Sequence, residues 1–220
     1  MKYLSFSLWG DKTIYNAGII SNVKLHAKGI YYNWKIVVYY DNSVPKKTID
    51  TLKYFGVKLI DMTGTNIYGM FWRFFSEDLP NAEYSCFRDC DSRISLREQL
   101  AVNEWINSGK SLHVMRDHPA HIIPFGNDRP GILGGMWGIK SGAIPLNKMI
   151  LDYVNNKELG YGADQTFLKS VYNLFENDKY TNDEFYEKKP FPIPRESGVF
   201  VGGRIDENEK PIGEDYMQVL

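Results

Sequence analysis

The chain alternates between short strand-like runs and helix-like runs over its first 140 residues, with Gly, Pro, Asn or Asp at most of the joints. This alternation is the pattern of repeated β-α-β units, in which a helix connects each strand to the next parallel strand. It predicts an α/β fold with a parallel sheet that is covered by helices on both faces. An apolar content of 43% supplies the core that one domain of 220 residues needs.

The predicted strands are short apolar runs, and they cover residues 4–8, 35–40, 57–60, 84–88 and 112–116. The predicted helices carry apolar residues at helical spacing, and they cover residues 19–30, 45–55, 68–75, 95–109, 146–153 and 165–175. Ser95 and Glu98 form a capping box at the start of one helix. Residues 118–142 are rich in Pro and Gly, which predicts a long loop with irregular strands, and such a loop in a compact domain is typically functional. The tail from Lys188 is predicted to wrap over the surface.

The charge of the chain is balanced, with 26 Lys and Arg against 27 Asp and Glu. A net charge of −1 provides no uniform field that would attract nucleic acid or an anionic membrane. No run of about 18 uncharged apolar residues is present, and the N-terminal apolar run is too short for a signal peptide. We therefore expect a cytoplasmic protein that has no nucleic-acid partner and no membrane span.

The strongest local signal is Asp89-Cys90-Asp91, directly after the fourth predicted strand. In an extended backbone the two aspartates share a face, and carboxylates about 7 Å apart repel by roughly 2 kcal/mol at an effective dielectric constant near 20. They therefore require a cation. A divalent Mn²⁺ or Mg²⁺ ion, completed by waters and a diphosphate, would meet this need. The alternative is an ordinary ion pair with Arg93.

Four predicted strands end at an aspartate: Asp41, Asp61, Asp89 and Asp117. They gather polar groups at the carboxyl edge of the sheet, where open α/β sheets bind ligands, although Asp is also a common turn residue. The glycine patterns of P-loop and Rossmann nucleotide sites are absent from the sequence. A diphosphate would therefore be held by a metal and basic side chains, for which Arg73 is the candidate.

Three further segments contain candidate site residues. Asp117 and His118 either line a polar pocket or belong to a plain loop. The run 134–138 combines glycines, whose backbone can approach a ligand closely, with Trp137, which either stacks on a sugar face or packs in the core. Asp164 precedes a helical run and is either its N-cap or a general base that deprotonates an acceptor hydroxyl.

In their order along the chain, these motifs resemble those of the GT-A-fold glycosyltransferases, metal-dependent enzymes that use nucleotide sugars. The resemblance covers essentially the whole chain and is carried by Asp89-Cys90-Asp91, Asp117-His118-Pro119, the run 134–138 and Ala163-Asp164-Gln165. It implies a central mixed, mostly parallel sheet flanked by helices, in a single domain over residues 1–220. Residues 1–115 would bind the nucleotide, and residues 116–220 would form the acceptor side and the tail.

The resemblance also implies a role for individual residues. Asp89 and Asp91 would hold Mn²⁺ or Mg²⁺, and Asp164 and Gln165 fall where the family places an acceptor-side acid or amide. The implied donor-binding residues are Ser7, Trp9, Gly10, Asp41, Arg73, Asp117, His118, Gly135 and Trp137. Some relatives close the metal site with a C-terminal histidine, but no histidine follows His121 here, so that ligand would be either absent or replaced by waters.

The implied activity is transfer of a sugar from a nucleoside-diphosphate sugar, such as a UDP-sugar, to a hydroxyl of a glycan or glycoprotein. Within the family, the chain looks like a small viral domain of the kind that decorates capsid proteins in the host cytoplasm. Inversion and retention of the anomeric centre both stay open at this point. Two other classes also fit paired carboxylates: a metal-dependent phosphohydrolase or nucleotidyltransferase, and a non-catalytic sugar-binding module.

Overall fold

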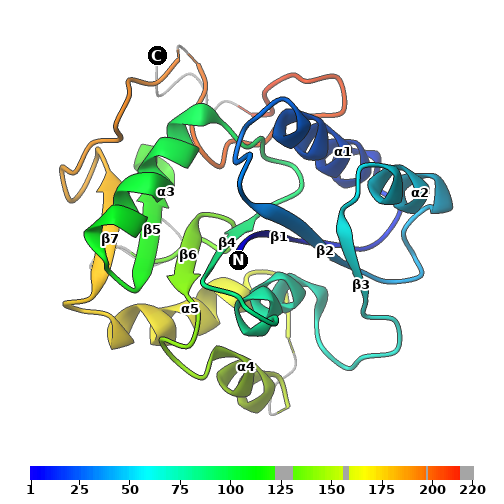
Figure 1. The fold of residues 1–220 in the computed structure, drawn as a ribbon, viewed down its shortest axis with the longest axis horizontal. Coiled ribbons are helices and arrows are strands. Elements are labelled where there is room, and N and C mark those ends of the chain that lie inside the picture. The colour runs from blue at the N-terminus through cyan, green and yellow to red at the C-terminus, as the bar shows by residue number, and fades with distance from the viewer. Residues whose placement is uncertain (122–130, 156–158, 197, 214–220) are drawn as a thin grey trace.

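A computed structural model describes residues 1–121, 131–155, 159–196 and 198–213. Its described strands form one sheet in the order β3-β2-β1-β4-β6-β5-β7 (Figure 1). The strands are β1 (Lys2–Leu8), β2 (Lys35–Tyr40), β3 (Lys58–Asp61), β4 (Tyr84–Arg88), β5 (Leu112–Arg116), β6 (Trp137–Lys140) and β7 (Lys179–Asp183). Strand β6 runs antiparallel to β4 and β5, and the other pairings are parallel. The predicted mixed, mostly parallel α/β sheet is confirmed.

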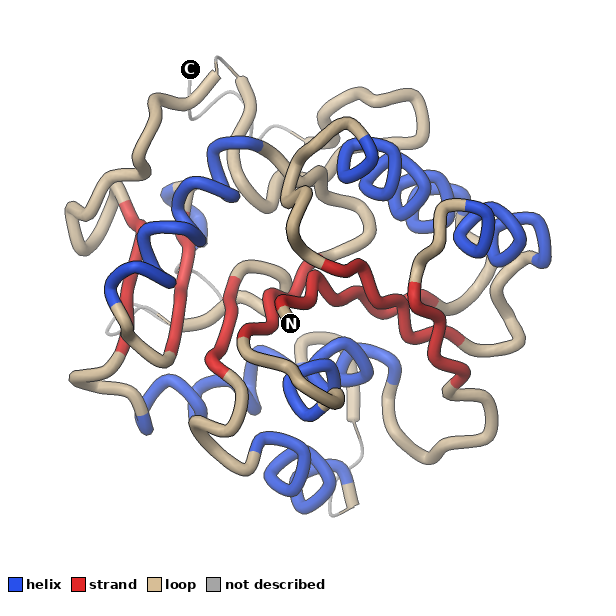
Figure 2. The backbone as a smooth tube through the Cα atoms, in the orientation of Figure 1, coloured by secondary structure: helices blue, strands red, loops and turns tan. Residues whose placement is uncertain are grey.

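Helices cover both faces of this sheet (Figure 2). One face packs against α1 (Thr13–Ala27), α2 (Lys46–Tyr54) and α3 (Leu96–Ser108). The other face packs against the 3₁₀ helix η1 (Gly69–Asp78), α4 (Leu146–Val154) and α5 (Ala163–Leu174). Among the described residues, no helix is both long and apolar enough to cross a membrane.

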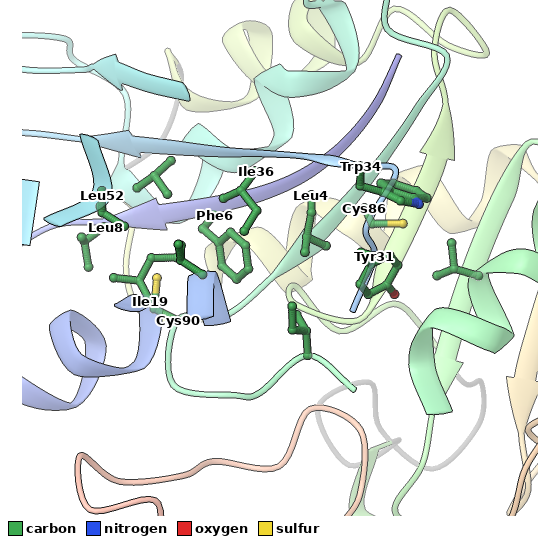
Figure 3. Close-up of a cluster of buried hydrophobic side chains, with 14 of the residues drawn as sticks. Leu4, Phe6, Leu8, Ile19, Tyr31, Trp34, Ile36, Leu52, Cys86 and Cys90 are labelled. Carbon is green, nitrogen blue, oxygen red and sulfur yellow. The ribbon is translucent and has the colours of Figure 1, made fainter. Parts of the chain in front are cut away.

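The alternation of side chains along β1 divides the core into these two layers. Leu4, Phe6 and Leu8 point toward α1 and α2, in a cluster that also contains the buried Cys86 and Cys90 (Figure 3). The intervening serines are also buried, but they face η1. Both serines form hydrogen bonds with the backbone of Arg73 in η1. These bonds place Arg73 beside the carboxyl edge of the sheet.

One strand and one helix type differ from the predictions. Strand β7 was not predicted, because its sequence Lys-Tyr-Thr-Asn-Asp has no apolar alternation. Two of its buried polar side chains instead have partners: Asn182 Nδ2 donates to Glu104 Oε2 at 3.1 Å, and Asp183 Oδ2 accepts from Arg116 Nη1 at 2.8 Å. Strand β6 lies in the segment 118–142, for which a long loop with irregular strands is predicted, and residues 122–130 of that segment fall outside the described part of the chain. The helix predicted over 68–75 is the 3₁₀ helix η1.

Candidate active site

A cleft of about 660 Å³ opens at the carboxyl ends of β1, β4 and β5, which is a suitable volume for a small-molecule ligand. Most of the residues that the sequence predicts for the site line this cleft: Ser7, Trp9, Gly10, Arg73, Asp89, Asp91, His118, Asp164 and Gln165. They come from segments far apart in sequence, which the parallel strands bring to one edge of the sheet.

Asp89 and Asp91 lie in the cleft with incomplete compensation of their charge. Asp89 forms an ion pair with Arg73, and its side chain remains 47% exposed. No ion pair of Asp91 is found among the described residues, and burial, reinforced by the charge of Asp89, raises its pKa to about 6. Arg93 pairs instead with Glu209, Nε to Oε2 at 2.9 Å, so the predicted alternative of an ion pair with Arg93 does not occur.

Arg73 links the acid pair to Asp164. Its guanidinium is buried, and its Nη2 donates to Asp164 Oδ2 at 3.0 Å, while Nη1 bonds Asp89. Burial disfavours the charge, but the two carboxylates outweigh it and raise the pKa of Arg73. Burial also raises the pKa of Asp164, against the opposing effect of Arg73. One guanidinium thus fixes both acids in the floor of the cleft.

Asp164 is not the N-cap of its helix. Gly162 occupies that position in a left-handed conformation, and Asp164 is the second residue of α5. Its Oδ1 accepts a hydrogen bond from the backbone N of Gln165 at 2.9 Å. The carboxylate is directed toward Arg73 and the cleft. Of the two predicted roles of Asp164, the general base therefore stays a prediction and the N-cap is wrong.

Ser5 and Ser7 of β1 position Arg73 through its backbone. The hydroxyl of Ser5 donates to the carbonyl oxygen of Arg73 at 2.7 Å, and the backbone N of Arg73 donates to Ser7 Oγ at 2.9 Å. These two bonds join the backbone of η1 to strand β1 at Arg73. Ser7 thus contributes to the site by holding a second site residue.

Gly134 and Gly135 make room for the three charged side chains. A Cβ at Gly134 would lie 2.7 Å from Arg73 Nη2 and closer still to Asp164. A Cβ at Gly135 would lie 2.5 Å from Asp89 Cγ. Gly135 does not itself line the cleft, but it allows Asp89 to occupy its place there. The glycine run therefore leaves space for these charged side chains, whereas the sequence predicts a close approach of its backbone to a ligand, which stays a prediction.

The donor set around Asp89 and Asp91 is compatible with a hard divalent cation. The described residues contain no group of three or more His, Cys, Asp or Glu side chains that could hold a metal ion. Two carboxylates with unbalanced charge nevertheless match the way Mg²⁺ and Mn²⁺ bind, with one or two protein carboxylates, waters and substrate phosphates. The pair therefore fits a cation that arrives together with a diphosphate.

Of the residues predicted to contact the nucleoside, Trp9 and Gly10 line the cleft and Asp41 does not. Trp9 is 41% exposed and packs edge-on against Trp72. The backbone N of Gly10 donates to Ser43 Oγ at 2.7 Å, and Ser43 is bonded to Asp41. Asp41 does not line the cleft, so its link to the site runs through Ser43.

Two predicted donor-binding residues lie in the interior. Trp137 is fully buried between Phe74 and Phe87, so it has no face open to a sugar, and the core-packing alternative is correct. Asp117 is also fully buried, and its carboxylate accepts hydrogen bonds from Arg97 and Arg195. A buried carboxylate requires such partners, and they turn it away from the cleft.

Several residues that line the cleft were not singled out from the sequence. They are Lys12, Tyr15, Tyr68, Tyr161 and Arg204. Tyr161 is 97% exposed, three residues before Asp164. Nothing in the sequence distinguishes these residues from ordinary surface residues, except that Tyr161 adjoins the Gly162-Asp164 segment. Arg204 reaches the site only through the path of the C-terminal segment, which sequence patterns do not specify.

Comparison with solved structures finds similar folds at low sequence identity. The crystal structure of S. aureus TarS 1-349 covers 86% of this chain at a TM-score of 0.57 and 14% identity, and its complex with UDP has a TM-score of 0.53. The galactosyltransferase LgtC, in complex with donor and acceptor sugar analogs, covers 84% of this chain at a TM-score of 0.54 and 12% identity. The chain shares the GT-A fold.

This chain is smaller than both of these structures. It spans 59% of the TarS chain and 74% of the LgtC chain. No family model matches the sequence, and no curated protein matches it. The similarity is therefore one of fold, and the function is argued below from the site.

Proposed function

We propose that this chain transfers a sugar from a nucleoside-diphosphate sugar, a UDP-sugar, to a hydroxyl of a glycan or glycoprotein, with Mn²⁺ or Mg²⁺ at the diphosphate. The observation that carries this proposal is the incompletely compensated pair Asp89 and Asp91, in one cleft with Arg73 and Asp164 at the carboxyl edge of a GT-A sheet. The UDP bound to TarS and the sugar analogs bound to LgtC support a nucleotide-sugar donor. The resemblance in sequence adds a viral capsid glycoprotein as the proposed acceptor, in the host cytoplasm.

Asp89 and Asp91 are the residues that would hold the cation. When bound, it supplies Lewis-acid stabilisation of the negative charge that develops on the departing diphosphate. Arg73 fixes Asp89 by its ion pair, and Gly135 leaves the space that the Asp89 side chain fills. The protein therefore presents two oriented oxygen donors before any ligand arrives, which is the arrangement that electrostatic catalysis requires.

Asp164 is the proposed proton acceptor. The acceptor oxygen forms a bond to the anomeric carbon while the bond from that carbon to the diphosphate oxygen breaks. The bonding electron pair leaves with the diphosphate, and the proton of the acceptor hydroxyl passes to the Asp164 carboxylate. The pKa of Asp164 is raised by burial, which brings a carboxylate closer to the range useful for a base at neutral pH. Direct attack of this kind inverts the anomeric centre, and Gln165 would orient the acceptor.

The test is turnover of a panel of UDP-sugars with Mn²⁺ and a set of sugar acceptors. Release of UDP, together with a product of inverted anomeric configuration by NMR, is expected. Asp89→Asn should lower turnover at least 100-fold, on the order of a lost electrostatic contact to the transition state. The matched control is Asp61→Asn, which removes an exposed carboxylate that does not line the cleft, and it should retain full turnover.

Three results would contradict the proposal. Release of inorganic phosphate or pyrophosphate instead of UDP would indicate a phosphohydrolase or a nucleotidyltransferase. Retention of the anomeric configuration would exclude Asp164 as the base of a direct displacement. Sugar binding with no dependence on a metal, and without turnover, would indicate a binding module.

A further inference from the structure

The C-terminal segment 200–209 forms one side of the cleft and is fixed at both ends. Phe200, Gly202 and Arg204 line the cleft. Between the two ends, the backbone N of Ile205 donates to the carbonyl oxygen of Asp91 at 2.8 Å. The segment is thus bonded directly to the backbone of the acid pair.

The upstream end is held by the buried carboxylate of Asp117. Its Oδ1 accepts from Arg97 Nη2 at 2.8 Å and from Arg195 Nη2 at 2.7 Å. Its Oδ2 accepts from the backbone N of Val201 at 2.9 Å. Asp117 is fully buried, and the side chains of Arg97 and Arg195 are only 8% and 14% exposed. Breaking such a buried pair leaves an uncompensated charge, so this end of the segment is strongly fixed.

The downstream end is held by Glu209. Its carboxylate accepts from Arg93 Nε at 2.9 Å and from Ser21 Oγ of α1 at 2.6 Å. Arg93 also donates to the carbonyl oxygen of Asp206 at 3.1 Å. Arg93 is two residues from Asp91, so this ion pair ties the segment to the same loop that carries the acid pair.

Arg204 lies between these two anchors, exposed and in the lining of the cleft. Its positive charge acts on Asp91 and on Tyr15 of α1, where it opposes the rise in the pKa of both groups. The other arginine of the cleft, Arg73, is buried and already engaged by two carboxylates. Lys12 is a third cation in the described lining, but Arg204 is the one whose neighbour Ile205 bonds the backbone of Asp91.

We propose that Arg204 is a diphosphate-binding residue, which the doubly anchored segment 200–209 holds beside Asp91. This inference rests on the proposed function, since the ligand is the diphosphate of a nucleotide. Guanidinium groups bind phosphate through paired, charge-assisted hydrogen bonds, and a fixed backbone reduces the entropy that such binding costs. The protein thus supplies a second arginine to the cleft, next to the acid pair.

The test is calorimetric titration of UDP and of uridine into the full chain, each with Mn²⁺ and with EDTA. Arg204→Gln is expected to weaken UDP binding about tenfold or more in both conditions, the usual range for a hydrogen bond between charged groups. Uridine, which has no phosphate, should bind the variant and the wild type equally. Lys210→Gln, which removes the same charge from an exposed residue of the same region, should bind UDP like the wild type.

Glu209→Gln tests the anchor. It should weaken UDP binding, and the double variant with Arg204→Gln should lose no more affinity than Arg204→Gln alone, because both changes act through one contact. Additive losses of UDP affinity would show that Glu209 acts independently of Arg204, which would contradict its role as the anchor of that residue.

Equal UDP affinity in Arg204→Gln and wild type, or an equal loss for uridine and UDP, would overturn the assignment of Arg204 while leaving the proposed function intact. Absence of UDP binding to the wild type in either condition would instead overturn the proposed function, and this inference with it.

Discussion

The charged residues of the cleft are arranged for a ligand and not for stability. Asp91 lies close to Asp89 and has no ion pair among the described residues, while Arg73 divides its guanidinium between Asp89 and Asp164. Burial of like charges disfavours the ligand-free protein, and an arriving cation removes that cost. This conflict leads to a prediction in which stability and activity change in opposite directions.

Asp91→Asn should stabilise the protein while it abolishes turnover. The pKa of about 6 means that the folded state disfavours the charged carboxylate at pH 7, so its removal should raise the free energy of unfolding by about 1–3 kcal/mol. Urea unfolding in EDTA at pH 7 measures this change. A loss of stability, or turnover equal to that of the wild type, would show that Asp91 is an ordinary structural residue.

Gly135→Ala should disturb the site without unfolding the chain. The added Cβ would lie 2.5 Å from Asp89 Cγ, so Asp89 must leave its position, at a cost of about 1–3 kcal/mol typical of overpacking. The half-saturating Mn²⁺ concentration should rise. Gly160→Ala is the matched control, because a Cβ there meets nothing within 4 Å and no positive φ is strained. An equal half-saturating Mn²⁺ concentration in Gly135→Ala and Gly160→Ala would contradict this role of Gly135.

For single residues, the sequence predicts those side-chain positions that depend on local spacing along a strand. Asp89 and Asp91 follow a strand with a period of two, and their shared exposure to the cleft was predictable for that reason. The positions of Asp117 and Trp137 were not, because only tertiary packing decides whether a polar or aromatic group after a strand turns inward. Arg97 and Arg195, which hold Asp117, lie 20 residues before it and 78 residues after it.

Among the elements, β5 shows how polar side chains are packed in this sheet. His113 is fully buried on β5, stacked on Trp105 of α3, and its Nε2 lies 2.8 Å from Asn182 Oδ1 of β7. Burial lowers the pKa of His113 to about 3. The strand pair therefore holds a neutral imidazole where the unfolded chain would carry a histidine that titrates near pH 6.5.

This burial predicts a loss of stability in mild acid. Between pH 7 and pH 5 the unfolded chain gains a proton at His113 and the folded chain does not, so the free energy of unfolding falls by about 2 kcal/mol from this residue. In His113→Gln the loss over that interval should be smaller by this amount. The control is His26→Gln, which changes a half-buried histidine near the end of α1. Urea unfolding at both pH values tests the prediction, and an unchanged loss in His113→Gln would contradict it.

The parallel strands and their helices were predictable, since apolar runs and glycine or proline boundaries define them locally. Strand β7 was not predictable, because it depends on partners that are distant in the sequence. Asp183 accepts from Arg116, Asn182 donates to Glu104, and the backbone of β7 pairs with β5. The helical type of η1 was also not predictable, because its backbone is held by Ser5 and Ser7 across the sheet.

For the molecule as a whole, the same architecture recurs in proteins that share only 12–14% of its sequence. What they share is the fold, and the chemistry of this chain depends on the few side chains that reach the carboxyl edge of its sheet. Here these are two carboxylates after β4, Arg73 from η1, Asp164 from α5 and the C-terminal segment. Balanced charge over the whole chain conceals this local concentration of acids.

The central claim is that Asp89 and Asp91 bind a nucleotide sugar through a divalent cation, and thermal unfolding with a panel of nucleotide sugars and Mn²⁺ tests it most directly. At 100 times its dissociation constant, a true donor adds about 2.7 kcal/mol, which corresponds to about 5–10 °C in the melting temperature of a chain of this size. We expect such a rise with a UDP-sugar and Mn²⁺, and most of it should disappear in EDTA and in Asp89→Asn. An equal rise in all three conditions, or no rise with any nucleotide sugar, would contradict the account.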